Sequence, residues 1–169
     1  KEVVALVELR ARFDEQNNID WSKQLESAGC TVIYGFDDYK VHSKLTLITK
    51  KSKAGYSYIT QIGTGNYNEK TSELYTDYSF ITADHGIGEE ASNVFQNLAV
   101  QKLTEESDRM LVAPLRFKSV LLEEMDRVIA AAHMGRPASM ILKNNSISDR
   151  DIILKLQEAS CAGVRIDMI

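Results

Sequence analysis

Polar and apolar residues alternate along two neighbouring stretches, residues 43–50 (SKLTLITK) and residues 56–63 (YSYITQIG). The five residues between them, KSKAG, are polar or small and end in a glycine. Alternation with a period of two, interrupted by a short glycine-containing loop, is typical of a β-hairpin. The pattern therefore predicts two antiparallel strands joined by a short turn.

The N-terminal part of the chain predicts a β-α-β unit. Residues 3–9 form an apolar run of strand length, and residues 17–29 space their apolar side chains at helical intervals before ending at Gly29. A β-branched run follows at residues 30–35. Strand, helix and strand in this order predict two parallel strands joined by a crossover helix.

The remaining chain alternates between helix and strand patterns. We expect Pro114 in the first turn of a long amphipathic helix, and Ser148 at the start of the last helix, where Asp151 completes a variant of the capping box. Helices are predicted for residues 89–100, 115–135 and 148–163, and strands for residues 77–82, 138–143 and 164–169.

These elements predict an α/β fold with a mixed sheet flanked by helices. The stretch from Gly86 to Ser107 is more polar and less patterned, so we place a boundary there. The predicted organisation is a first lobe at residues 1–86, a connecting helix or linker at 87–107, and the opening of a second lobe at 108–169. The helix-glycine-strand joints at residues 23–35 and 155–169 echo each other, which is compatible with two lobes of similar plan.

Composition narrows the function classes. The chain has 169 residues, 44% of them hydrophobic, and a formal net charge of -4, which argues against a general nucleic-acid binder. No apolar stretch approaches the ~18 residues of a membrane helix. Cys30 and Cys161 lie far apart without metal-ligand spacing, so we expect reduced thiols and a cytoplasmic protein. Strand-like sequence at both ends leads us to expect part of a longer protein.

Basic residues gather in one segment of this acidic chain. Five lysines and no Asp or Glu lie between Tyr39 and Asn68. Lys50, Lys51 and Lys53 have an ordinary explanation as the solvated tip of the predicted hairpin. The remaining two, Lys40 and Lys44, flank a histidine and need a separate account.

His42 and Lys44 are candidate phosphate-binding residues. Strand alternation places them on the same face, ~7 Å apart along the strand, so that both side chains can converge on one anion. The alternative is a histidine at a strand edge that only hydrogen-bonds a neighbour, and this segment taken alone favours that alternative. His85 in a polar loop and His133 at a helix C-terminus have ordinary explanations.

The sequence IGTGNYNEK supplies further candidates. Gly63 and Gly65 follow a strand, where backbone without Cβ can bend sharply or approach a ligand closely, and Asn66 and Asn68 present amide donors. A plain turn is the alternative. Because the preceding strand pairs with the strand that carries His42, the ends of both segments should meet, in a set of donors that suits a phosphate group.

Arg12 lies between the first strand and the first helix, where α/β sheets place ligand-binding groups. A planar guanidinium at this point can bridge two phosphate oxygens. An ion pair of Arg12 with Asp14 or Glu15 is an equally good interpretation.

Four stretches, VELRARFDEQNNIDW, VHSKLTLI, IGTGNYNEKTSELYTDYS and AAHMGRP, resemble the polyphosphate kinase family. The resemblance covers nearly the whole chain and implies a phospholipase D-like catalytic lobe with the opening of a second, similar lobe. It implies transfer of the terminal phosphate of ATP to inorganic polyphosphate, reversibly and through a phosphohistidine. The family's second essential histidine and a further ATP-contacting arginine are expected beyond Ile169.

The resemblance also implies roles for individual residues. His42 matches the phosphorylated histidine, and Tyr75 matches a tyrosine assigned to ATP binding. The charge of Lys44 beside His42 leads us to expect that it stabilises the phosphate. Arg12 matches an arginine of the Mg²⁺ site, which we interpret as contact through phosphate oxygens because a guanidinium is a poor metal ligand. Gly65 and Asn66 complete the predicted ATP and phosphate site.

The expected partners are ATP or ADP and polyphosphate, with Mg²⁺ as cofactor and no nucleic acid. The resemblance implies a homo-oligomer at full length and peripheral membrane association, and we expect the chain alone to be inactive. Two alternatives stay open: a phospholipase D-like phosphodiesterase and a non-catalytic polyanion-binding module. The phosphodiesterase pattern has Asp five residues after the lysine, where this chain has Thr49.

Overall fold

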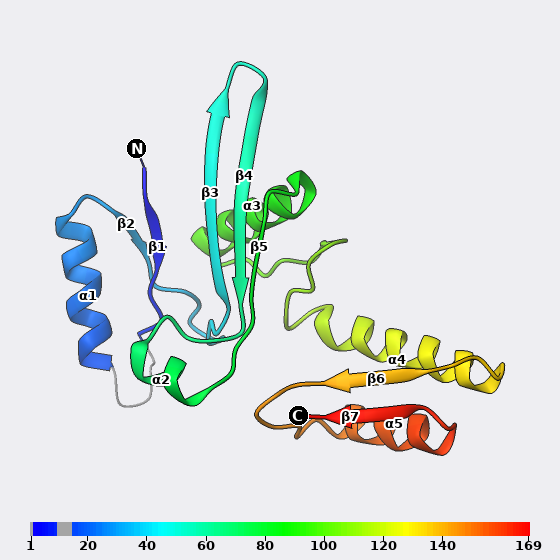
Figure 1. Ribbon diagram of the computed structural model, residues 1–169. Helices are drawn as coiled ribbons and strands as arrows, with labels where there is room; N and C mark the ends of the chain where they lie inside the picture. The colour runs from blue at the N-terminus through cyan, green and yellow to red at the C-terminus, as the bar shows by residue number, and fades with distance from the viewer. Residues whose placement is uncertain (1, 10–14) are drawn as a thin grey trace. The chain divides into compact units, whose positions relative to one another are not determined.

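The computed structural model describes residues 2–9 and 15–169 (Figure 1). The chain divides into two compact units, Lys1–Met110 and Leu111–Ile169. Both units combine helices with strands, so the predicted α/β class with mixed strand pairing is confirmed. Residues 87–107, expected to connect two lobes, lie within the first unit. The assignment of the units to catalytic lobes stays a prediction.

The first unit opens with the predicted β-α-β arrangement. Strands β1 (Val4–Leu6) and β2 (Thr31–Ile33) pair in parallel, and helix α1 (Glu15–Ser27) connects them. The helix ends at Ser27, and Gly29 follows with a φ of +86°, in the left-handed region that favours glycine. Its start at Glu15 is two residues earlier than the sequence pattern predicts.

A three-stranded antiparallel sheet forms the centre of the first unit. Strands β3 (Lys44–Ser52) and β4 (Gly55–Gly63) make the predicted hairpin, and β5 (Ser79–Thr82) pairs with the end of β4. A short helix, α2 (Glu69–Leu74), connects β4 to β5 and has no counterpart in the sequence prediction. The hairpin extends well beyond β5, as Figure 1 shows.

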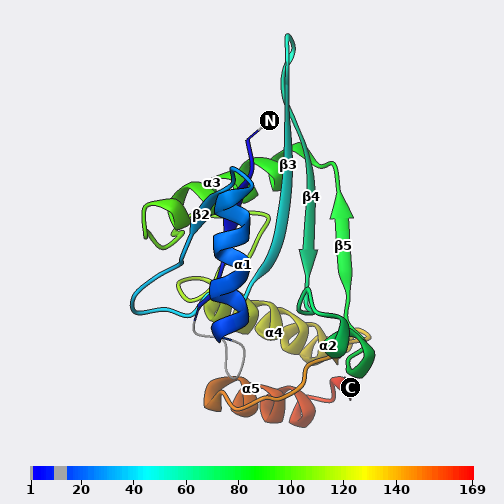
Figure 2. The same ribbon diagram turned by 90° about the vertical axis from the view of Figure 1, so that its left-hand side faces the viewer.

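Helix α3 (His85–Ala99) crosses one face of this sheet (Figure 2). Its Gly88 lies directly on Tyr58 of β4, and a Cβ at Gly88 would stand only 2.6 Å from the ring atom Cδ2. Thr60 beneath the helix is completely buried, as is Ala91 of the helix itself. The opposite face of the sheet carries Ile48 and Ile59, both about half exposed.

The second unit repeats the parallel β-α-β plan. Helix α4 (Phe117–His133) precedes β6 (Ser139–Leu142), and helix α5 (Arg150–Cys161) leads into β7 (Arg165–Met168), which pairs with β6 in parallel. The core of this unit consists of Ile129, Ala159 and Val164, each 5% exposed or less.

Two sequence predictions about helix starts in the second unit are wrong. The N-cap of α5 is Asp149, whose carboxylate accepts the backbone N–H groups of Asp151 and Ile152, so Ser148 lies outside the cap. Pro114 lies before α4 instead of in its first turn, because the helix begins only at Phe117. Within the described part of the chain, no helix combines the length and apolar character that crossing a bilayer requires.

Candidate active site

His42 and Lys44 lie together where the chain enters β3. Lys44 is the first residue of the strand and only 8% exposed. Its Nζ lies 2.8 Å from Nδ1 of His42 and 2.7 Å from the His42 carbonyl oxygen, which accepts a hydrogen bond from the ammonium. The structure therefore brings the two predicted residues into direct contact, and it holds the imidazole beside a buried cation.

This contact shifts the pKa of both groups. Partial burial, followed by the positive charges of Lys44 and Lys40, lowers the pKa of His42 below its ordinary 6.5, against a smaller opposing hydrogen bond to its own backbone. Burial lowers the pKa of Lys44 as well, although the nearby carboxylate of Asp77 works in the other direction. His42 is thus held in the neutral form that a nucleophile needs, while remaining exposed to solvent.

The strand pairing explains why a lysine can be buried here. Lys44 pairs with Gly63 at the end of β4, and a Cβ at Gly63 would lie 3.6 Å from Cβ of Lys44. The lysine stem therefore packs beside the backbone of the neighbouring strand. With its ammonium hydrogen-bonded to His42, the cation is buried without losing its polar partners.

Asp77 is a member of this cluster that sequence reasoning did not assign. Its side chain lies on Gly65, where an added Cβ would stand 2.6 Å from the carboxyl carbon, and its Oδ1 accepts a hydrogen bond from Thr64 Oγ1 at 2.8 Å. A signal for Asp77 did exist in the register. Gly63 pairs with Ser79, so continuing the antiparallel pairing by two residues sets Gly65 opposite Asp77.

The loop that contains Asn66 is tied to the open face of the sheet through Tyr67. The Tyr67 hydroxyl donates to Gln61 Oε1 and accepts from Thr46 Oγ1 at 3.0 Å. Asn68 then caps α2 by accepting the backbone N–H of Thr71. Asn66 stands exposed directly before these two anchored residues, which suits an amide that meets a ligand from solution.

Tyr75 is the C-cap of α2 and 53% exposed. Within residues 2–9 and 15–169, no hydrogen bond joins the side chains of Tyr75 or Asn66 to His42 or Lys44. Arg12 lies outside the described residues. The predicted roles of these three residues, and that of Gly65 toward phosphate, therefore stay predictions.

Glu8 is a second residue that the sequence analysis did not assign. Its Oε2 accepts the backbone N–H of Val41 at 2.9 Å, and its carbonyl oxygen accepts a hydrogen bond from Asn18. Glu8 follows β1 at the carboxyl end of a parallel strand, the same general position that drew attention to Arg12. Its carboxylate holds the backbone of the segment that carries His42.

The described residues do not fit a metal site built by the protein alone. No three His, Cys, Asp or Glu side chains in this part of the chain gather into a group that could hold a metal ion. The carboxylate of Asp77 beside the Lys44–His42 pair is already bound by Thr64. Mg²⁺ is commonly bound by one or two carboxylates together with substrate phosphates, so the described residues would need the phosphates of a nucleotide to complete such a site.

Comparison with known proteins identifies two matching family models. The model described as Polyphosphate kinase C-terminal domain 1 matches residues 1–104. The model described as Polyphosphate kinase C-terminal domain 2 matches residues 110–169.

Several curated relatives match the entire chain. A polyphosphate kinase of Staphylococcus saprophyticus is 44% identical over 169 residues, and one of Vibrio vulnificus is 43% identical over the same length. The chain spans only 24% of the length of these relatives. The crystal structure of polyphosphate kinase from Porphyromonas gingivalis matches with a TM-score of 0.85 and 34% identity, covering 99% of this chain and 28% of that one.

Proposed function

This chain belongs to the polyphosphate kinase family, and on that premise we propose that the full-length protein transfers the terminal phosphate of ATP reversibly to inorganic polyphosphate. In this proposal His42 is the nucleophile that receives the phosphate. The observation that supports it is a solvent-exposed imidazole, kept neutral by partial burial and by the Lys44 ammonium in contact with it. A nucleophile for an anionic substrate needs an unprotonated ring nitrogen and a nearby positive charge, and His42 has both.

The first step is attack by a ring nitrogen of His42 on the γ-phosphorus of ATP. A nitrogen–phosphorus bond forms, the bond from the γ-phosphorus to the bridging oxygen breaks, and ADP leaves with the electron pair. The covalent intermediate divides one transfer into two, because the terminal oxygen of a polyphosphate chain then attacks the same phosphorus and frees His42. Lys44, which contacts the His42 ring, stabilises the negative charge on the transferred group in this proposal.

The position of Lys44 bears on which ring nitrogen attacks. As an ammonium it can only donate, and its Nζ lies 2.8 Å from Nδ1 and 3.5 Å from Nε2, so the tautomer of the ring decides which nitrogen accepts. Attack through Nε2 uses the tautomer in which Nδ1 carries the proton, so no proton has to leave the neutral ring before the nitrogen–phosphorus bond forms. Attack through Nδ1 needs Lys44 to turn toward the arriving phosphate. The ³¹P signal of the phosphorylated protein distinguishes the two products.

Mg²⁺ belongs to the proposal as an ion that arrives with the nucleotide, where it would offset charge on the phosphate oxygens. Tyr75, Asn66, Gly65 and Arg12 are the proposed contacts to ATP and its phosphates. We further propose that the 169-residue chain alone does not turn over polyphosphate, because family residues needed for the transfer are expected beyond Ile169.

The test is phosphate labelling of the full-length protein with ATP carrying ³²P at the γ-position. The wild-type enzyme should take up acid-labile, base-stable phosphate, and His42→Ala should take up none. His133→Ala, which changes a histidine at the end of α4, is the matched control and should label normally. Undiminished labelling of His42→Ala would remove His42 from the nucleophile's role. A wild-type protein that binds polyphosphate without labelling would favour a polyanion-binding module.

A further inference from the structure

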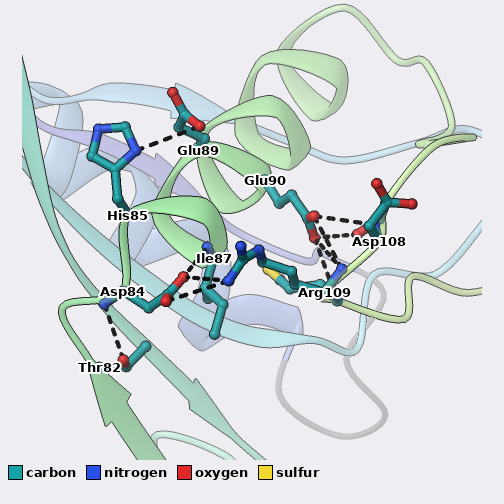
Figure 3. Close-up of polar contacts among 10 residues, drawn as sticks. Thr82, Asp84, His85, Ile87, Glu89, Glu90, Asp108 and Arg109 are labelled. Carbon is teal, nitrogen blue, oxygen red and sulfur yellow. Dashed lines mark hydrogen bonds and ion pairs between the residues drawn. The ribbon is translucent and has the colours of Figure 1, made fainter.

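The carboxylate of Glu90 on α3 is surrounded by donors from a single short segment, residues 107–110. Ser107 Oγ donates to it at 2.6 Å, and the backbone N–H groups of Asp108, Arg109 and Met110 donate at 3.1, 3.0 and 2.8 Å. Figure 3 shows the Glu90 side chain pointing from the helix at the backbone of Asp108 and Arg109. Successive backbone N–H groups around one anion form a nest, and here the anion belongs to the protein.

The same segment is held a second time through the side chain of Arg109. Its guanidinium forms an ion pair with Asp84 at 3.2 Å, and Asp84 is also the N-cap of α3. The guanidinium lies over Gly86, where an added Cβ would stand 2.8 Å from the central guanidinium carbon. Backbone and side chain of the segment are thus both fastened to the first turns of one helix (Figure 3).

The position of this contact along the chain gives it importance. The first compact unit ends at Met110, and the two family models end and begin at residues 104 and 110. We call the contacts of Glu90 with residues 107–110 the clamp. The clamp therefore holds the segment by which the chain passes from one domain to the next. Glu90 lies 17 residues before Ser107 and 20 before Met110, so it reaches across the connector from the body of the first unit.

Electrostatics favour an ionised Glu90. Burial raises the pKa of this carboxyl, but the hydrogen bonds from Ser107 and from the three backbone amides outweigh it and lower the pKa overall. Hydrogen bonds to an ionised acceptor are stronger than those between neutral groups. The clamp is consequently a charge-assisted contact at neutral pH.

We propose that Glu90 is a positioning residue: its carboxylate fixes residues 107–110 against α3 and thereby fixes the point from which the second domain leaves the first. Where it concerns catalysis, this rests on the proposed function, since a phosphoryl transfer site completed by residues beyond Ile169 needs both domains held in a productive arrangement. Small errors of placement are costly in such sites.

The first test is amide hydrogen exchange in the full-length protein. Glu90→Gln exchanges one acceptor oxygen for an NH2 group that faces donors, so residues 108–110 should exchange about tenfold faster or more, while α3 itself stays protected. Glu89→Gln is the matched control. The Glu89 side chain is 59% exposed, and it forms an ion pair with the equally exposed His85. Equal exchange in the two variants would overturn the clamp.

The second test is the rate of polyphosphate synthesis. Glu90→Gln should lower kcat about tenfold and change KM for ATP much less, because the proposed ATP contacts Tyr75 and Asn66 lie in the first unit. Ser107→Ala removes one donor and should show the same change in weaker form, and the double variant should fall short of the product of the two effects.

The outcomes separate this proposal from the proposed function. Faster exchange at residues 108–110 with unchanged kcat would overturn the positioning role. A wild-type protein that transfers no phosphate would refute the proposed function, and the exchange comparison would still decide whether Glu90 holds the connector. Should Glu90→Gln lose the protection of α3 as well, Ser107→Ala, the milder change, carries the test.

Discussion

The two β-α-β units of the chain share the same local construction at the end of their helices. In the first unit, α1 stops at Gly29 with φ of +86°, and Cys30 N–H donates back to the Leu25 carbonyl at 3.0 Å. In the second, α5 stops at Gly163 with φ of +84°, and Val164 donates to Ala159 at 3.0 Å. Each glycine supplies the left-handed turn that sends the chain into the following parallel strand.

The burial of the helix differs between the two β-α-β units. Ala159 and Ile152 of α5 are buried, and Ala159 joins Ile129 and Val164 in a core. Among the described residues of α1, Ser22 alone is buried, and Leu25, which corresponds to Ala159, is only partly covered. The comparison teaches that a helix stop is specified locally, whereas burial depends on what covers the helix. The first unit instead presents Glu8 at its strand end, beside the segment of His42.

The largest expected effect comes from removing core volume in the second unit. Ile129→Ala should lower the free energy of unfolding of that unit by about 3 kcal/mol, because it leaves a cavity beside Ala159 and Val164. Leu25→Ala in the first unit should cost only about 1 kcal/mol, because less apolar area is lost. Amide exchange measured separately for peptides of each unit gives both values. Equal costs would contradict the difference in packing described above.

A smaller and equal effect is expected at the two helix stops. Gly29→Ala and Gly163→Ala each force a side chain into the left-handed region, at a cost of roughly 1–2 kcal/mol. Nothing lies within 4 Å of the added Cβ at either position, so strain alone determines the cost. Chemical denaturation should give matching values for the two variants. Gly135→Ala, at φ of +69° and also in open space, is a control that should agree with both.

The smallest effect concerns the titration of His42. Because its pKa lies below 6.5, the full-length protein should keep its labelling rate as the pH falls through 6.5, where an ordinary histidine is half protonated. Lys44→Met removes the second cause of the shift, after burial, and should move the midpoint upward. NMR titration of the His42 ring checks the pKa directly, and a midpoint that does not move would exclude Lys44 as a cause.

The lowered pKa of His42 also makes the stability of the folded protein depend on pH. A histidine whose folded-state pKa is lowered binds its proton more readily in the unfolded chain, so acidification through 6.5 favours unfolding. The contribution is present above that pH and is lost below it. Solvent screens the exposed ring, which keeps the effect small.

Much of the fold could be predicted because its signals are local. Alternation predicted β3 and β4 to within two residues at their ends, and Gly29 and Gly163 correctly marked helix ends. Helix starts were less reliable, because Ser148 and Asp149 are both good capping residues and the pattern does not decide between them. Helix α2 is six residues long and has no buried residue, so it leaves no amphipathic pattern to find.

The candidate site could be predicted only in part. His42 and Lys44 lie two residues apart, so their nearness in the sequence was enough to join them, although β3 begins only at Lys44 and His42 precedes it. Asp77 depends on the register between β4 and β5, and Glu8 depends on a contact with Val41 that is 33 residues distant. Contacts of this kind arise from the folded topology, and no local pattern carries them.

Strand β3 has a consequence for solubility. Among the strands of the described residues it pairs only with β4, so one border of a nine-residue strand bears unpaired backbone groups. Such a border is a template on which a second molecule can add its own strand. Lys50 and Lys51 stand on its outer half, and Lys53 at the tip, where like charges on two approaching copies repel. We expect these three lysines to oppose self-association at this border, and their neutralisation to favour it.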